Sequence, residues 1–218
     1  MRKMLFLIAV VLTAAALYSA DSHAWISART GERNFERAWS AFMSKQPDTA
    51  MGYFAKSADA YGLALDENPP SRTTSFPSSL TMAGISAYYA GRNDQVLEAM
   101  GKALDKDDSI WEGYIYTALA YARMNDKAHA EEFLEKYIKS NPSQSILSSE
   151  VQRQRSVLDD GAAVAGIVRP LEGALFDQFH NNVLFVGRKA DDPAGMCGGP
   201  FWWRNNRQPC DRSFDFRS

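Results

Sequence analysis

Residues 77–142 read PSSLTMAGISAYYAGRNDQVLEAMGKALDKDDSIWEGYIYTALAYARMNDKAHAEEFLEKYIKSNP, and this stretch contains a unit that returns after 34 residues. The corresponding pairs are Gly84 and Ala118, Gly91 and Asn125, Val96 and Ala130, Met100 and Leu134, and Asp108 and Pro142. Each unit has a small residue where two helices must approach, a turn residue that tolerates left-handed backbone angles, and a helix breaker at its end. The period therefore predicts stacked helical hairpins.

The helices of two hairpins can be placed from this register. One pairs residues 78–90 with 94–104, and the next pairs 110–124 with 127–139. Upstream, apolar residues at helical spacing predict a helix that runs from Asn34 and ends at Pro47, then a second helix that Asp48 and Thr49 cap. These two helices form a first hairpin, whose end matches the next one at a spacing of 39 residues. Residues 25–33 are expected to be a polar lead-in.

The period and its small residues resemble the tetratricopeptide repeat. The resemblance implies an all-α fold, a short right-handed stack of about three helical hairpins. The residues after the repeat add C-terminal capping helices and a small disulfide-tied irregular or β tail to this expectation. The resemblance also implies a partner-binding groove lined by the first helix of each hairpin. The groove positions fall on Thr81, Ile85, Tyr88, Tyr89, Glu112 and Arg123. The alternative is that these side chains are buried under the C-terminal segment, and the sequence leaves both open.

Beyond Pro142 the repeat stops, which divides the chain into residues 25–142 and a C-terminal region, residues 143–218. Residues 143–158 predict a capping helix, and Asp159 and Asp160 can cap a further helix that continues past Pro170. Residues 183–186 form a β-branched and aromatic run, and residues 212–217 alternate polar and apolar side chains. Both patterns predict short strands.

The first 24 residues have the composition of a signal peptide. Arg2 and Lys3 precede an apolar run, and Ala24 ends a small-residue cleavage motif. The chain is therefore expected in a bacterial periplasm or outside the cell. The alternative is an uncleaved anchor, and membrane association is expected only in that case. Both cysteines, Cys197 and Cys210, follow the predicted cleavage site, and an even number in an exported chain predicts a disulfide.

The loop that this disulfide would close is the second candidate contact surface. It contains Phe201, Trp202 and Trp203, followed by Arg204 and Arg207. Because neighbouring side chains of an extended backbone face opposite sides, at least one of the three aromatic rings should lie at the surface. Exposed tryptophan beside arginine is typical of interaction hot spots. The alternative is a lid that covers the capping helices with both tryptophans buried.

The sequence predicts no catalytic residue, metal ligand or cofactor. His129 and His180 have no second ligand at suitable spacing, and a net charge of −2 disfavours a nucleic acid partner. We therefore expect a non-enzymatic scaffold or adaptor that binds a protein partner in a cell-envelope or extracellular assembly. Two alternatives stay open: a glycan- or ligand-binding accessory protein that uses the C-terminal Trp/Arg loop, and a structural subunit of a larger complex or filament.

Overall fold

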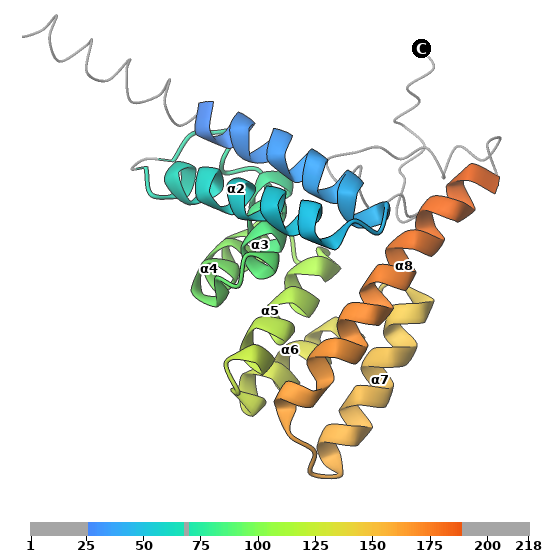
Figure 1. Cartoon of the computed structure of the whole chain (residues 1–218). Helices are drawn as coiled ribbons and strands as arrows, with labels where there is room; N and C mark the ends of the chain where they lie inside the picture. The colour runs from blue at the N-terminus through green and yellow to red at the C-terminus, as the bar shows by residue number, and fades with distance from the viewer. Residues whose placement is uncertain (1–25, 68–69, 189–218) are drawn as a thin grey trace, which may run out of the picture.

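The computed structural model describes residues 26–67 and 70–188, with the side chains of residues 183–188 excepted, and every regular element in these ranges is a helix (Figure 1). A helix over residues 26–43 is followed by α2 (Pro47–Leu65), α3 (Pro77–Tyr89), α4 (Asn93–Leu104), α5 (Trp111–Arg123), α6 (Lys127–Lys139), α7 (Ser145–Asp159), the short 3-10 helix η1 (Val164–Ile167) and α8 (Val168–Arg188). The all-α class is thus confirmed for the described residues.

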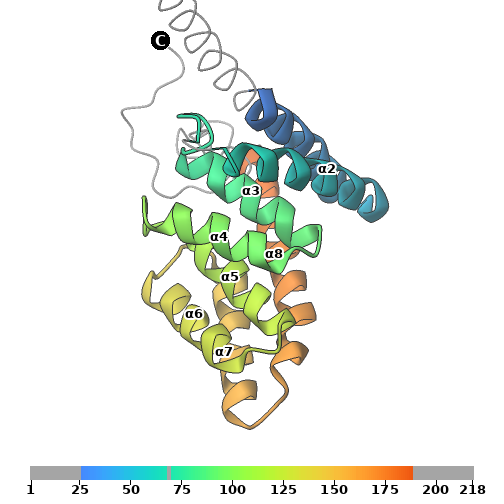
Figure 2. The ribbon, with the colours of Figure 1, turned by 90° about the vertical axis from the view of Figure 1, so that its left-hand side faces the viewer.

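Consecutive helices pack against each other along most of the chain. α3 packs on α4 and α5 on α6, while α2 contacts α3 and α4 contacts α5, which gives the row of helices in Figure 2. The turns inside the α3–α4 and α5–α6 pairs contain Gly91 and Asn125, with φ angles of 74° and 59°. Both residue types adopt the left-handed region at low cost, so these two predicted turns are confirmed.

The first described helix differs from its prediction at both ends. The expected lead-in is helical from residue 26, and Ser57 Oγ of α2 donates a hydrogen bond of 2.8 Å to the carbonyl of Gly31. A Cβ atom at Gly31 would lie only 2.8 Å from the Tyr61 ring, so glycine allows this close approach. Small residues carry little hydropathy signal, which is why the sequence pattern does not show this part of the helix.

The sequence predicts that Pro47 ends a helix, but in the structure Pro47 begins α2. The preceding helix ends at residue 43, and Lys45 makes the turn with a φ of 56°. Proline suits the first position of a helix because the amide that it lacks has no intrahelical partner there. The predicted side-chain cap by Asp48 is therefore also wrong; Asp48 is an acidic residue within the first turn of α2.

The C-terminal helices correct two further predictions. Asp159 is the last residue of α7 and Asp160 is its C-cap, so neither residue caps the next helix. The predicted strand at residues 183–186 lies within α8. Extending a helix adds one hydrogen bond for each residue that is fixed, whereas a strand needs a pairing partner, and the described ranges contain no strand.

α8 crosses the row of hairpins and completes the core. It packs along α7 and also contacts η1 and α5 (Figure 1). Leu171, Leu175 and Phe179 are buried at successive four-residue spacings, as expected for the buried stripe of an amphipathic helix. α8 is therefore a component of the folded core.

Candidate functional site

The structure places two of the six predicted groove residues, Tyr88 and Arg123, against Glu172 of α8. Thr81, Ile85, Tyr88 and Glu112 are buried, whereas Tyr89 and Arg123 are half-buried. They therefore do not form an open groove in this structure. For Tyr88 and Arg123 the arrangement corresponds to the alternative drawn from the sequence, a position under the C-terminal segment.

A polar network fixes α8 to this surface. Glu172 of α8 accepts hydrogen bonds of 2.6 Å from the Tyr88 hydroxyl and from Nη2 of Arg123. Nη1 of Arg123 donates to the carbonyl of Tyr88 at 2.7 Å, and its guanidinium lies 3.6 Å from the centre of the Tyr88 ring. Burial, followed by the neighbouring Glu172 carboxylate, raises the pKa of Tyr88 far above its ordinary value. The phenol is therefore a neutral donor.

Aromatic side chains of α8 also pack against the neighbouring helices. The centre of the Phe179 ring lies 4.7 Å from that of Trp39 and 5.5 Å from that of Trp111. The centres of the Phe176 and Phe42 rings are 5.2 Å apart. These contacts join α8 to the helix over residues 26–43 and to α5. Neither Glu172 nor Phe179 was identified as a contact from the sequence, because no local pattern indicates which face α8 covers.

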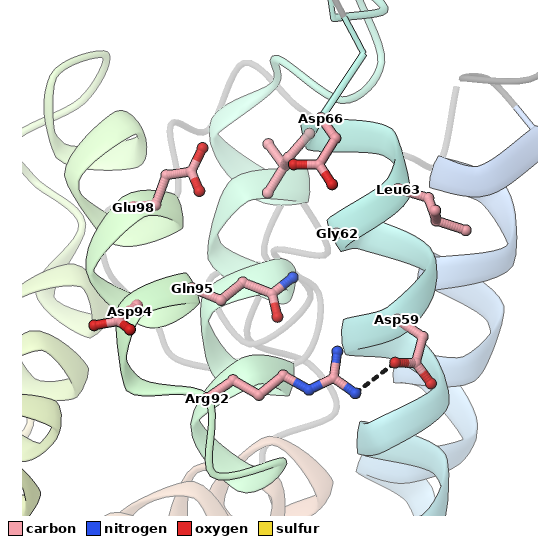
Figure 3. Close-up of a pocket in the computed structure, with 9 residues that line it drawn as sticks. Asp59, Gly62, Leu63, Asp66, Arg92, Asp94, Gln95 and Glu98 are labelled. Carbon is pink, nitrogen blue, oxygen red and sulfur yellow. Dashed lines mark hydrogen bonds and ion pairs between the residues drawn. The ribbon is translucent and has the colours of Figure 1, made fainter.

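An open hollow lies elsewhere, between α2 and α4 (Figure 3). We call it the acidic hollow, and its volume is about 550 Å³. Its walls come from the second half of α2 and from the start of α4: Asp59, Gly62, Leu63, Leu65, Asp66, Arg92, Asp94, Gln95 and Glu98. No functional site predicted from the sequence included these residues, because the hollow forms between helices that are more than twenty residues apart in the chain.

Gly62, Gln95 and Leu63 shape the floor and rim of the acidic hollow. Gly62 has no side chain to fill the space, and a Cβ atom there would lie 3.0 Å from Nε2 of Gln95. That amide is already held, since it donates to the carbonyl of Ala58 at 3.0 Å. At the rim, Leu63 is 64% exposed. The hollow thus combines a polar wall with an exposed apolar side chain.

The charge of the acidic hollow is negative. Four carboxylates line it against one guanidinium, that of Arg92, which pairs with Asp59 (Figure 3). Glu98 pairs with Lys102 on the same helix at 2.6 Å. Asp66 and Asp94 have no ion pair within the described part of the chain. A cationic ligand would complement this surface.

Several other predictions lie outside the described residues. These are the signal segment, residues 1–24, the strand at residues 212–217, the Cys197–Cys210 disulfide and the loop residues Phe201, Trp202, Trp203, Arg204 and Arg207. Residues 26–67 and 70–188 contain no group of three or more His, Cys, Asp or Glu side chains that could hold a metal ion. Among the helices in these ranges, none is both long and apolar enough to span a membrane.

Comparisons with protein-family models, curated proteins and solved structures found no match for this chain.

Proposed function

We propose that this chain is a non-enzymatic, exported adaptor that joins proteins in a cell-envelope or extracellular assembly. In this proposal it is a stack of three tetratricopeptide-like hairpins with capping helices. The 34-residue period and the left-handed turns at Gly91 and Asn125 support the repeat assignment. The composition of residues 1–24 and the even number of cysteines support export.

The partner surface that we propose is the acidic hollow. A partner cannot reach Tyr88 without displacing α8, and that would break the Glu172 network and expose aromatic core residues. The acidic hollow is open, and Leu63 at its rim is the most exposed of the large apolar side chains in the described residues. An exposed leucine beside a hollow of about 550 Å³ carries the proposal, because a large exposed apolar side chain at a concave surface suits a protein interface.

Site-specific crosslinking in the native cells tests this assignment. A photoreactive benzophenone amino acid would replace Leu63 in one variant and Ile146 in a control. Ile146 is a matched position because it is also apolar, is 37% exposed and lines a hollow of about 410 Å³ between α7 and α8.

We expect a discrete covalent adduct of higher mass from position 63 and none from position 146. The adduct is to be identified by mass spectrometry of the excised band. Adducts of equal yield from both positions, or no adduct from position 63, would show that the acidic hollow is not the partner surface.

A further inference from the structure

A second hollow lies between α4, α5 and α6. We call it the aromatic hollow, because Tyr114, Tyr121 and Phe133 line its walls, and its volume is about 510 Å³. The Thr117 hydroxyl belongs to the same lining; the residue is 4% exposed, and its oxygen has no hydrogen-bond partner among the described residues. A buried hydroxyl without a partner is unfavourable.

The two hollows occupy equivalent places in the repeat. Gly62 and Gly101 line the acidic and the aromatic hollow respectively, and they are separated by the same 39 residues that relate the ends of the first two hairpins. The amide of Asp66 donates to the carbonyl of Gly62 at 3.0 Å, and the amide of Asp105 donates to that of Gly101 at 2.9 Å. Gly62 and Gly101 therefore occupy corresponding positions near the ends of α2 and α4.

A third, smaller hollow shares one lining residue with each of them, and we call the three hollows together the groove. Leu65 lines both the acidic hollow and this middle hollow, and Asp105 lines both the middle and the aromatic hollow. A single elongated ligand could thus contact α2, α4 and α6 at once.

Two carboxylates of this groove lie at the C-terminal ends of helices, where a negative charge is unfavourable. Asp66 and Asp105 are the C-caps of α2 and α4, and the negative end of a helix dipole repels a carboxylate. α2 has no basic residue in its last turn, and in α4 the Lys102 ammonium is paired with Glu98. Violations of a local rule without compensation are typical of functional sites.

The charges that remain unpaired along the groove are mostly negative. Asp66, Asp94 and Asp105 have no ion pair within the ranges that the structure describes, and Lys106 is the single unpaired cation among the lining residues. Lys136 is already paired with Glu132 at 2.7 Å.

We propose that this groove binds an elongated polypeptide segment that carries lysine or arginine together with apolar or aromatic side chains. The cationic side chains bind Asp66, Asp94 and Asp105, and the apolar ones cover Leu63 and fill the aromatic hollow. This inference rests on the proposed adaptor function and adds the chemistry of the partner to it.

Selection from a displayed library of random 12-residue peptides on the immobilised full chain tests the proposal. A triple variant, Asp66→Asn, Asp94→Asn and Asp105→Asn, serves as the comparison. We expect peptides rich in Lys or Arg and in aromatic or aliphatic residues to be enriched at least tenfold on the unaltered chain relative to this variant. Replacing the arginines of a selected peptide by neutral citrulline should weaken its binding at least tenfold.

The control removes as many exposed carboxylates elsewhere, with Asp159→Asn, Asp160→Asn and Asp177→Asn. This variant should select the same peptides as the unaltered chain. The proposal is overturned if no peptide is enriched, if the enriched peptides lack cationic residues, or if the triple variant at the groove selects them equally well. In those cases an adduct of higher mass from position 63 that contains a second protein would still support the adaptor function.

Discussion

Gly84 sets the distance between α3 and α4. A Cβ atom at this position would lie 2.6 Å from Cε and 2.8 Å from Sδ of Met100, a side chain that is itself fully buried. Gly84→Leu should therefore force the two helices apart and lower the free energy of unfolding by about 2 to 3 kcal/mol. Urea denaturation followed by circular dichroism would measure the loss.

Gly101→Ala provides the matched control for this substitution. Gly101 lies in the helix that faces Gly84, but a Cβ atom there would meet nothing within 4 Å. The added methyl group should leave stability unchanged or raise it by up to about 1 kcal/mol, because alanine favours the helix. Equal losses from both substitutions would mean that the close approach at Gly84 is not what the fold requires.

Glu172 is the residue on which the polar network at α8 depends. Glu172→Ala would leave both the Tyr88 hydroxyl and the Arg123 guanidinium without their carboxylate, so we expect a loss of about 2 to 3 kcal/mol. Tyr88→Phe keeps the Arg123–Glu172 ion pair and should cost only about 1 kcal/mol. The same urea experiment ranks the two variants, and a larger loss for Tyr88→Phe would contradict this account of the network.

At the scale of the element, α8 depends on the ring of Phe179. Because this ring is fully buried between Trp39 and Trp111, Phe179→Ala should cost about 3 to 5 kcal/mol and destabilise the whole described fold. Phe176→Ala should cost distinctly less, since Phe176 is only half-buried. Thermal unfolding of the two variants measures both effects, and equal midpoints would show that Phe179 does not anchor α8.

The elements themselves were predictable where a repeat supplied their boundaries. The left-handed turns at Gly91 and Asn125 end helices within one or two residues of the predicted positions. Prediction failed where only local composition was available. Pro47 is compatible with either end of a helix. Residues 183–186 have the composition of a strand, although they lie within α8.

At the scale of the whole molecule, the surface to which each residue belongs was harder to predict than the element that contains it. Tyr88 and Arg123 do lie together, but the partner that they share, Glu172, is 84 and 49 residues away in the chain. The acidic hollow depends on similar long-range contacts between α2 and α4, those of Arg92 with Asp59 and of Gln95 with the carbonyl of Ala58. No pattern within one helix contains this information.

The buried tyrosines predict how the whole fold responds to alkali. Burial is the largest cause of the raised pKa of Tyr61, Tyr88, Tyr89, Tyr116 and Tyr137. Since an unfolded tyrosine has a pKa of about 10, their contribution to stability is complete below this pH. It is lost as the pH rises further, because the unfolded chain then releases protons that the folded chain retains.

We therefore expect a cooperative alkaline unfolding above about pH 10. Phenolate absorbance at 295 nm from these five residues should appear together with the loss of helical circular dichroism. Ionisation of all the phenols while the helical signal stays intact would contradict the burial of these side chains.

α8 covers the face of α3 and α5 that carries Tyr88 and Arg123, and we propose that partners therefore bind at the acidic hollow. Hydrogen exchange of the free full chain, read by mass spectrometry of its peptides, tests this claim most directly. The amides of residues 171–182 should exchange as slowly as those of α3 and α5, because all three helices open only on global unfolding. Exchange in α8 that is at least a hundredfold faster than in α3 and α5 would contradict the claim, since the covered face would then be accessible to a partner.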